Sequence, residues 1–264
     1  MKRIDSRENA HFKALRRLVE SSRERRVSGL SVLDGPHLVG LYGQRIGVPE
    51  QIVLNRTGLE SPEISELVKR LSGADVILLS DALFKDISPV ATPTGIVAVV
   101  KTPRPRPLPT RLDTCVMLEG LQDPGNLGAV LRSAAAAGVK HVLLSQNSVH
   151  AWSPRVLRAG MGSHFMLQIY EQADLVVAAD AFPGTVLATR ASARRSLFDT
   201  DLSGTVALLF GNEGAGLSAE LRKKAHAEIA IPMPGKTESL NVAAAVAISL
   251  FERVRQSTVS GKRR

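Results

Sequence analysis

Three segments of the sequence place glycines and polar side chains directly after apolar runs. They are 118–126 (Leu-Glu-Gly-Leu-Gln-Asp-Pro-Gly-Asn), 210–218 (Phe-Gly-Asn-Glu-Gly-Ala-Gly-Leu-Ser) and 231–241 (Ile-Pro-Met-Pro-Gly-Lys-Thr-Glu-Ser-Leu-Asn). The three glycines between Gly211 and Gly216 let a backbone approach a ligand closely or adopt positive φ, although a flexible turn would use them equally well. These segments are the candidate ligand-binding loops.

The first segment opens a predicted helix over 127–137 and carries two candidate side chains. The apolar stripe of this helix comprises Leu127, Val130, Leu131 and Ala134. Asn126 lies at the helix start, where an amide side chain can serve as a cap. Arg132 lies off the stripe, and a guanidinium on an alanine-rich helix is costly to bury unless it meets an anion. We therefore expect an anionic partner for Arg132.

The third segment ends in Ser239 and Asn241, at the start of an apolar helix. The simplest role for Ser239 is to cap that helix. The sequence Gly235-Lys236-Thr237 also invites a phosphate-loop interpretation. That interpretation fails, because position 230 is alanine where the motif needs glycine, and prolines at 232 and 234 remove two backbone amides.

Other site chemistries find little support. No segment after a predicted strand matches the glycine fingerprint of dinucleotide-binding folds. The six histidines contain no pair at i, i+4, so no metal site is expected. The single cysteine, Cys115, excludes an internal disulfide framework and is expected to be a small buried apolar residue.

The composition is that of an ordinary folded protein with a basic surface. Of the 264 residues, 44% are hydrophobic and 22% charged, which excludes a chain that is disordered throughout its length. Lys and Arg outnumber Asp and Glu by 34 to 25, and the net charge of +9 favours a polyanionic partner. No run approaches the roughly 18 apolar residues of a membrane span, and no apolar leader follows Met1. The positive charge therefore favours nucleic acid over a membrane surface as the partner. The protein is expected in a reducing, cytosolic compartment.

Apolar runs alternate with helical patterns along most of the chain. An amphipathic helix is predicted within 8–20, and its polar side carries Lys13, Arg16 and Arg17, which are either solvated or in contact with RNA. Strands at 30–33, 51–54, 76–79 and 96–100, with helices near 36–42 and 62–71, indicate a small α/β domain. Strands at 115–118, 141–144, 165–169, 186–188, 206–210 and 229–231, alternating with helices, are typical of a mostly parallel sheet. Prolines at every second position of 103–109 favour an extended linker between the two parts.

Taken together, the three loops resemble the motifs of the SpoU-type, TrmH-like branch of the SPOUT RNA methyltransferases. The matching stretches are 123–134, 210–217 and 231–242, and 153–162 (Ser-Pro-Arg-Val-Leu-Arg-Ala-Gly-Met-Gly) is similar to a further helix-and-turn segment of the family. In the first domain, 33–39 and 87–97 look like the family's substrate-binding domain. One departure is Ala243, where many relatives have a serine after Ser-Leu-Asn-Val.

The resemblance implies an α/β fold in two domains. A substrate RNA-binding domain, similar to small RNA-binding ribosomal proteins, would occupy 1–100, and a Pro/Arg-rich linker would occupy 101–112. A parallel-sheet SPOUT domain with a deep trefoil knot would occupy 113–264. The family also implies a homodimer in which one subunit helps to complete the site of the other.

The resemblance further implies S-adenosyl-L-methionine as the cofactor and no metal. The implied cofactor contacts are Leu187, Ala188, Thr189, Gly211, Asn212, Ile231, Met233, Ser239 and Leu240. The implied catalytic residues are Arg132, Asn126, Ser239, Asn241 and Glu213. Arg132 would clamp the phosphate next to the target nucleotide, and Asn126, Ser239 and Asn241 would orient the ribose. Glu213 would fix Arg132 or its own loop, and Arg132 would join Lys13, Arg16 and Arg17 among the RNA contacts.

The function implied in this way is methylation of a ribose 2′-hydroxyl in RNA, in the cytoplasm. Relatives with a separate N-terminal RNA-binding domain act mostly on large-subunit (23S) ribosomal RNA, so that substrate is expected here. Transfer RNA is an alternative substrate. A non-catalytic RNA-binding or assembly protein is an alternative of a different class.

Overall fold

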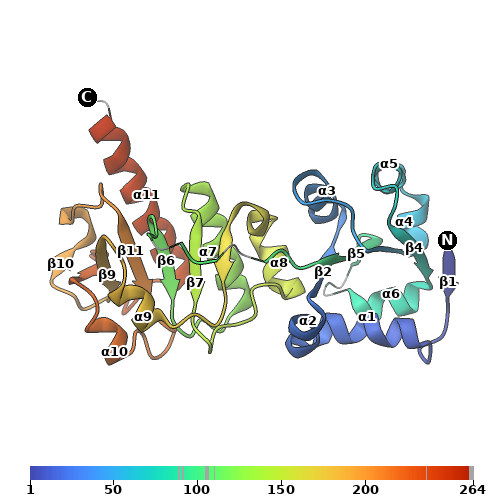
Figure 1. The fold of residues 1–264 in the computed structure, drawn as a ribbon, viewed down its shortest axis with the longest axis horizontal. Coiled ribbons are helices and arrows are strands. Elements are labelled where there is room, and N and C mark those ends of the chain that lie inside the picture. Colours follow the sequence, from blue (N-terminus) through green and yellow to red (C-terminus); the bar gives the residue numbers. More distant parts are fainter. Residues whose placement is uncertain (89, 91, 105–106, 110, 236, 262–264) are drawn as a thin grey trace. The chain divides into compact units, whose positions relative to one another are not determined.

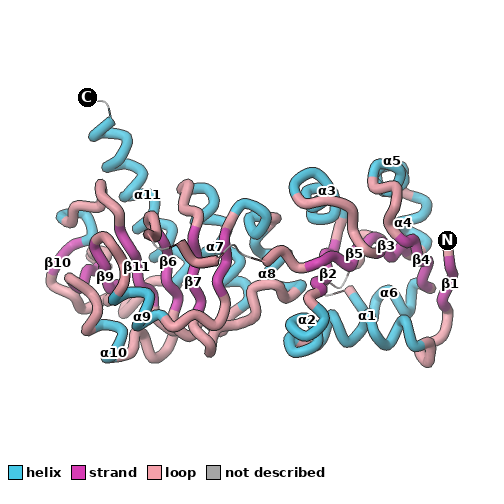
Figure 2. The backbone as a smooth tube through the Cα atoms, viewed as in Figure 1, coloured by secondary structure: helices cyan, strands magenta, loops and turns pink. Residues whose placement is uncertain are grey.

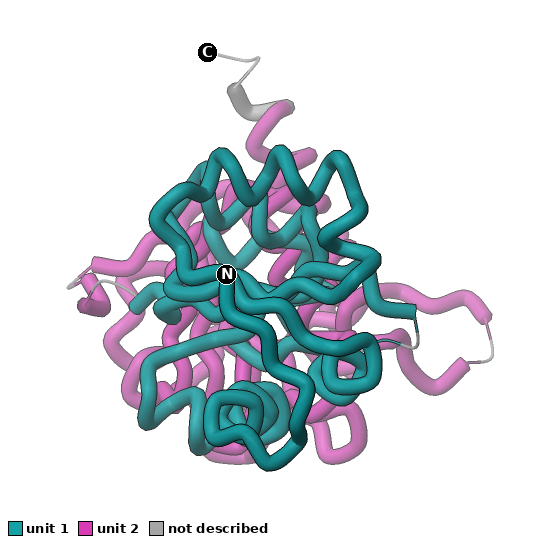
Figure 3. The backbone as a smooth tube through the Cα atoms, turned by 90° about the vertical axis from the view of Figure 1, so that its right-hand side faces the viewer, with its two compact units in different colours: residues 1–104, 152–165 teal, residues 105–151, 166–264 magenta. Residues whose placement is uncertain are grey.

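The computed structural model describes residues 1–88, 90, 92–104, 107–109, 111–235 and 237–261 (Figure 1). They form two compact units, unit 1 from 1–104 and 152–165, and unit 2 from 105–151 and 166–264 (Figure 3). The expected domain division differs in one segment, because 152–165 packs with unit 1 although it lies within the stretch assigned to the second domain. Pro105, Arg106 and Thr110 of the expected linker lie outside the described residues.

Unit 1 is built around a mixed sheet. Its elements are β1 (Lys2–Ile4), α1 (Ala10–Glu20), α2 (Ser22–Ser28), β2 (Leu30–Asp34), α3 (Pro36–Arg45), β3 (Gln51–Leu54), α4 (Arg56–Glu60), α5 (Pro62–Arg70), β4 (Asp75–Leu79), α6 (Asp81–Ile87), β5 (Ile96–Lys101) and α8 (Pro154–Gly160). The strand order is β1-β4-β3-β5-β2, with β5 antiparallel to both of its neighbours and the other pairs parallel. Helices α1 and α6 cover one face and α3 and α5 the other (Figure 1). Unit 1 therefore combines a sheet with covering helices, as the sequence pattern led us to expect for this part of the chain.

The first face of that sheet shows why the opening helix forms where it does. Asn9 caps α1 by accepting hydrogen bonds from the backbone N–H groups of His11 and Phe12. Phe12, Leu15 and Leu18 then fall on one side of the helix and are buried against the sheet and α6. The predicted amphipathic helix is therefore present, and its charged side faces solvent.

Unit 2 contains a second sheet, whose strands are magenta in Figure 2. Each of its described strands is parallel to its neighbours. Its elements are β6 (Cys115–Leu118), α7 (Pro124–Ala136), β7 (His141–Leu144), β8 (Gln168–Tyr170), α9 (Leu175–Asp180), β9 (Thr185–Thr189), β10 (Arg195–Ser196), the 3-10 turn η2 (Leu197–Asp199), β11 (Val206–Phe210), α10 (Ala219–Arg222), β12 (Ala227–Ala230) and α11 (Val242–Gly261). The strand order is β10-β12-β9-β11-β6-β7-β8. This confirms the parallel sheet.

Both faces of the unit 2 sheet are buried, as a parallel sheet requires. One face packs against α9 and α10 through alternate strand residues such as Met117 and Leu209. The other side of the unit holds α7 and α11, which pack against each other and carry fully buried residues such as Leu131 and Val246. Cys115 is fully buried, and burial raises the pKa of its thiol to about 12, so it is an apolar core residue as expected.

Two strand predictions are displaced. The apolar run at 165–169 was expected to be a strand, but Ser163–Met166 forms a 3-10 turn and β8 begins only at Gln168. The strand expected at 229–231 lies at Ala227–Ala230. A short apolar run fits a strand and a buried turn equally well, so periodicity could not separate them.

None of the described helices has the length and apolarity that crossing a membrane requires.

Candidate functional site

A cavity opens at the carboxyl ends of β9, β11 and β12, in unit 2. Its volume is ≈ 970 Å³, and every residue that lines it belongs to unit 2. The strand order explains its position, because β11 lies between β6 and β9 although both precede it in the chain. Ligands of open parallel sheets bind outside the carboxyl ends of the strands at such a change of order. The three candidate loops all contribute to its wall.

Seven of the nine expected cofactor contacts line this cavity. They are Thr189, Gly211, Asn212, Ile231, Met233, Ser239 and Leu240. Leu187 and Ala188 are not among the lining residues, since they lie within β9 and are buried in the core. Only the carboxyl end of β9, at Thr189, reaches the cavity, where its hydroxyl donates to the carbonyl of Leu209 over 2.8 Å.

The second loop folds back on itself so tightly that position 211 has no room for a side chain. Asn212 and Gly216 exchange two backbone hydrogen bonds, and a Cβ at Gly211 would lie 2.1 Å from the carbonyl carbon of Gly216 and 2.2 Å from the amide nitrogen of Leu217. Real Cβ atoms do not approach backbone this closely. Asn212 also ties this loop to the first one, because its Nδ2 donates to the carbonyl of Gly120 over 2.7 Å. Glycine is thus required at position 211, because the backbone of Gly216 and Leu217 approaches it closely.

Three expected catalytic side chains, one from each loop, form a hydrogen-bonded row at the cavity. Asn241 Nδ2 donates to Asn126 Oδ1 over 2.8 Å, and Asn126 Nδ2 donates to Glu213 Oε1 over 3.1 Å. The orientation of the two amides is fixed from one end, because Asn241 Oδ1 accepts from the backbone N–H groups of Ala243 and Ala244. Each amide therefore keeps one further N–H that can donate to a polar ligand.

The helix caps differ from the expected ones. Asp123, whose Oδ1 accepts from the backbone N–H of Asn126 over 2.7 Å, caps α7. Asn241 rather than Ser239 accepts from the first turn of α11, so the expected capping role of Ser239 is wrong. The Ser239 side chain is exposed at the cavity and makes no hydrogen bond with the described residues. The amide of Asn126 and the hydroxyl of Ser239 are consequently available to a ligand.

Arg132 does not reach the cavity of its own chain. Its side chain is exposed, it is absent from the lining, and it makes no hydrogen bond or ion pair with the described residues. It follows Asn126 on α7 by six residues, which corresponds to about 240° of rotation and about 9 Å of rise. Glu213 binds Asn126 and the backbone N–H of Gln122, and within the described residues it has no contact with Arg132. The partners of Glu213 are therefore both in the first loop.

The three expected RNA contacts on α1 are each paired with an acid. Lys13 bonds to Glu8, Arg16 to Glu20 over 2.7 Å and Arg17 to Glu24 over 4.0 Å. All three cations are exposed and belong to unit 1, whereas the residues that line the cavity belong to unit 2. Exposed pairs of this kind are worth little in stability, and the acids reduce the local positive charge.

Sequence reasoning missed two arginines at the cavity wall. Arg190 and Arg222 both line it, and they share Glu228, at 3.2 Å and 3.5 Å. For Arg190 a usable signal was present, since 190–195 carries three arginines shortly after the strand expected at 186–188. The loops after parallel strands meet at one edge of the sheet, so an arginine there is expected near the other candidate loops. Among the described residues, no three His, Cys, Asp or Glu side chains are grouped so as to hold a metal ion.

The hydrogen-bonded row yields a test of Asn126. Replacing Asn126→Ala should lower kcat about tenfold or more, because the donor to the ligand and the link between Glu213 and Asn241 are both lost. Asn126→Asp removes the same donor and places a second carboxyl against Glu213, so its kcat should be at least as low as that of Asn126→Ala. Turnover of Asn126→Asp equal to that of the unchanged protein would show that the contact with Glu213 does not matter for turnover.

Comparison with known proteins identifies relatives of the whole chain. The model of the SpoU rRNA Methylase family matches residues 113–251. The chain is 30% identical to the 23S rRNA (guanosine(2553)-2′-O)-methyltransferase RlmP of Bacillus subtilis, over 95% of this chain and 98% of that protein. The structure of the AdoMet-bound rRNA methyltransferase from Sinorhizobium meliloti is similar over 96% of this chain and 97% of that chain, with 28% identity and a TM-score of 0.82.

A tRNA-modifying relative matches a smaller part. The structure of the TrmH/SpoU tRNA modifying enzyme of A. aeolicus covers 58% of this chain and 79% of that chain. Its sequence identity is 26% and its TM-score 0.50.

Proposed function

The chain belongs to the SpoU rRNA methylase family, and from this we propose that it transfers a methyl group from S-adenosyl-L-methionine to a ribose 2′-hydroxyl of large-subunit (23S) ribosomal RNA. The observation that carries the proposal is the row Glu213–Asn126–Asn241. Asn126 lies 87 positions before Glu213 and 115 positions before Asn241 in the chain, yet the three side chains meet at one cavity. Each of them comes from a different family motif. Such convergence is typical of a reaction site.

The cavity fits the cofactor in size and chemistry. Its ≈ 970 Å³ lies within the roughly 300–1,000 Å³ of small-molecule sites. Ile231, Met233 and Leu240 provide apolar wall, and Leu240 leaves 37% of its surface uncovered beside the cavity. Gly211 brings backbone into the wall where no side chain fits. These residues would hold the adenosine and methionine parts, and the bound cofactor supplies an electrophilic methyl group on a sulfonium.

The work left to the protein is alignment and removal of one proton. The remaining amide N–H groups of Asn126 and Asn241, and the hydroxyl of Ser239, orient the ribose by hydrogen bonds. Glu213 acts through Asn126, whose amide it fixes. Arg132 binds the phosphate beside the target ribose, and that phosphate or a transiently neutral Arg132 accepts the proton of the 2′-hydroxyl.

Because Arg132 lies away from the cavity of its own chain, the proposed enzyme is a homodimer in which Arg132 of the partner subunit completes the site. The exposed side of α11 supports an interface, since Ala244, Phe251 and Arg255 lie along one stripe and Phe251 is 49% exposed. The proposal includes the trefoil knot of the family. Support for it comes from β11, which is inserted between two strands that precede it in the chain.

Ribosomal RNA is preferred over transfer RNA as the substrate. Two relatives that match nearly the whole chain, from Bacillus subtilis and Sinorhizobium meliloti, are named as rRNA methyltransferases, whereas the tRNA-modifying enzyme of A. aeolicus covers only 58% of it. We assign RNA binding to unit 1 and the reaction to unit 2, in the cytoplasm. Within the described part of unit 1, Arg23 and Arg26 on α2 are exposed and have no acidic partner, which makes them stronger candidates for phosphate contacts than the paired cations of α1.

The test is to map ribose methylation in RNA from cells with and without the gene, and to methylate the RNA of the deletion strain with purified protein and labelled cofactor. One 2′-O-methyl group in 23S rRNA should disappear on deletion and return in vitro. Its appearance in transfer RNA instead would establish the alternative substrate. Binding of the cofactor without methyl transfer to any RNA would indicate a non-catalytic RNA-binding protein.

A further inference from the structure

The segment 190–198 borders the cavity and carries an unusual combination of side chains. It begins directly after β9, and Arg190 and Ala191 at its start and Leu197 near its end line the cavity. Its middle forms the edge strand β10, where Arg195 is the register partner of Ile229 on β12. The segment therefore runs along the rim of the reaction site.

Two of the three arginines of this segment have no ion-pair partner among the described residues. Arg190 pairs with Glu228, but Arg194 and Arg195 are exposed and make no hydrogen bond or ion pair through their side chains with any described residue. The one acid of the following turn, Asp199, is exposed and also has no ion-pair partner among the described residues. Two free guanidiniums beside a cavity are a binding surface for phosphate.

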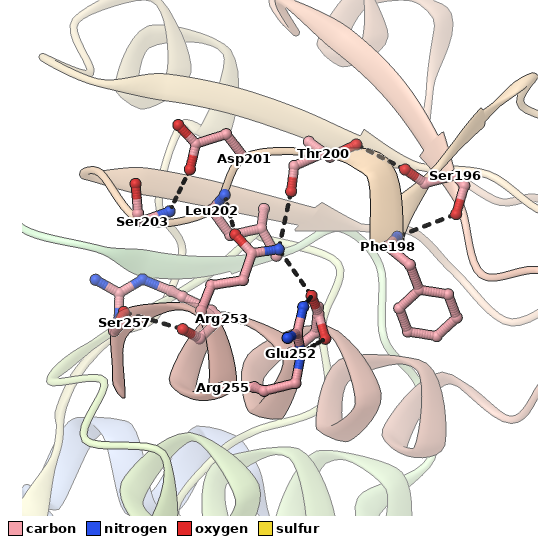
Figure 4. Close-up of polar contacts among 11 residues, drawn as sticks. Ser196, Phe198, Thr200, Asp201, Leu202, Ser203, Glu252, Arg253, Arg255 and Ser257 are labelled. Atoms are coloured by element: carbon pink, nitrogen blue, oxygen red, sulfur yellow. Dashed lines mark hydrogen bonds and ion pairs between the residues drawn. The ribbon is translucent and has the colours of Figure 1, made fainter. Parts of the chain in front are cut away.

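The turn that follows carries an exposed aromatic ring, Phe198 (Figure 4). Leu197 is fully buried, whereas the next side chain, Phe198, is 49% exposed. The backbone of the turn is closed locally, since Ser196 Oγ accepts from the N–H of Phe198 over 3.0 Å and Thr200 Oγ1 donates to the carbonyl of Ser196 over 2.7 Å. The ring of Phe198 points away from the polar contacts that hold this turn (Figure 4).

Helix α11 anchors the same turn through one amide side chain. Gln256 accepts from the N–H of Leu202 over 2.8 Å and donates to the carbonyl of Thr200 over 3.0 Å. Glu252, which is buried, accepts from the same amide over 2.7 Å. The exposed ring is thus presented by a rigid turn, and a partner that stacks on it does not have to order the backbone.

We propose that the 190–198 segment is a contact for unpaired RNA, in which Arg194 and Arg195 bind phosphates next to the target ribose and Phe198 stacks on an unpaired base. Cations that follow a backbone and an aromatic ring that offers its face are the two parts of single-strand recognition. The inference rests on the proposed function, since it concerns the strand that enters the same site.

The test is fluorescence anisotropy with a labelled single-stranded RNA of about 20 nucleotides and mixed sequence, and with the duplex of the same sequence. Phe198→Ala should weaken binding of the single strand about tenfold and leave the duplex nearly unchanged, because paired bases do not expose their faces. Phe198→Tyr should restore the affinity, whereas Phe198→Leu should not. Arg194→Ala with Arg195→Ala should weaken both RNAs and reduce the slope of log affinity against log salt by about 1.4 for the single strand.

The matched control is Lys140→Ala with Lys224→Ala, which removes the same charge from the same unit. Lys140 is exposed and directly precedes β7. Lys224 precedes β12 and pairs with Asp180 at the end of α9, before β9, so both lysines lie at the edge of the sheet where the strands begin. This control should keep the RNA affinity, and all variants should keep the cofactor affinity measured by calorimetry. Equal losses in the control and the Arg194/Arg195 variant would overturn the inference.

Two further outcomes separate this inference from the proposed function. If the unchanged protein methylates 23S rRNA but its variants at 194, 195 and 198 bind and methylate as well as it does, the segment has no role in RNA binding. If Phe198→Ala leaves the RNA affinity unchanged and alters the mass found by sedimentation, the ring belongs to an interface between copies of the chain, which overturns the inference. Failure of the unchanged protein to methylate any RNA would instead remove the proposed function.

Discussion

Arg132→Ala should abolish methyl transfer while the protein still folds and binds S-adenosyl-L-methionine. In the proposed reaction the guanidinium holds the phosphate next to the attacking hydroxyl, and removing such a preorganised charge costs at least about 100-fold in kcat. The side chain is exposed and makes no hydrogen bond or ion pair within the described chain, so its loss removes no stabilising contact there. Single-turnover methylation of 23S rRNA, with cofactor affinity from calorimetry, measures both effects.

Arg132→Lys tests whether a positive charge alone is sufficient at this position. Lysine keeps the charge but loses the planar fork that binds two phosphate oxygens, so an intermediate rate is expected. Lys140→Ala, an exposed cation just after the same helix, is the control and should turn over normally. Turnover of Arg132→Ala close to that of the unchanged protein would remove Arg132 from the reaction.

Gly211→Ala should abolish cofactor binding, with a loss of affinity of about 100-fold or more. The added Cβ would lie 2.1 Å from the carbonyl carbon of Gly216, which is backbone and cannot rotate away. The loop that walls the cavity must therefore shift, and Asn212, which ties it to Gly120, must shift with it. Calorimetric titration with S-adenosyl-L-methionine measures the effect.

Gly214→Ala is the matched substitution within the same loop. A Cβ there would meet only Asn212 Oδ1, at an ordinary 3.5 Å, and Gly214 does not have a positive φ. We expect its cofactor affinity to stay within about threefold of the unchanged value. Since the loop is exposed at 214–216, both variants should keep their secondary structure by circular dichroism. If Gly211→Ala binds the cofactor as tightly as Gly214→Ala, the close backbone approach at position 211 is not part of the cofactor site.

Much of the fold could be predicted from the sequence because burial imposes clear patterns on it. The fully buried strands β6 and β11, and β7 with its three buried residues, lie at the predicted positions, since each is a short apolar run between polar turns. The edge strands β1 and β10 were missed, because Lys2-Arg3 and Arg195-Ser196 show no apolar pattern. The association of 152–165 with unit 1 was also missed, because packing between segments distant in the chain leaves no local periodicity.

The candidate site, like the fold, could be predicted only in part from the sequence. Gly211, Asn241 and Glu213 could be placed at one edge of the sheet because each follows a predicted parallel strand. Which side chain caps which helix could not be predicted, because Asp123 and Asn126, or Ser239 and Asn241, are equally good caps within one turn. The position of Arg132 relative to the cavity depends on the rotation of α7 about its axis, and the apolar stripe of that helix does not specify it closely enough.

The central claim is that the cavity of one subunit works with Arg132 of the other, and a mixed dimer tests it most directly. Two differently tagged chains, one with Arg132→Ala and one with Gly211→Ala, are expressed together, and the heterodimer is isolated by both tags. Each parent dimer should be inactive, but the heterodimer contains one site with an intact cavity and an intact Arg132, so about half of the unchanged rate per dimer should return. If Arg132 serves its own chain, both sites of the heterodimer are defective, and an inactive heterodimer that binds one cofactor would contradict a site shared between subunits.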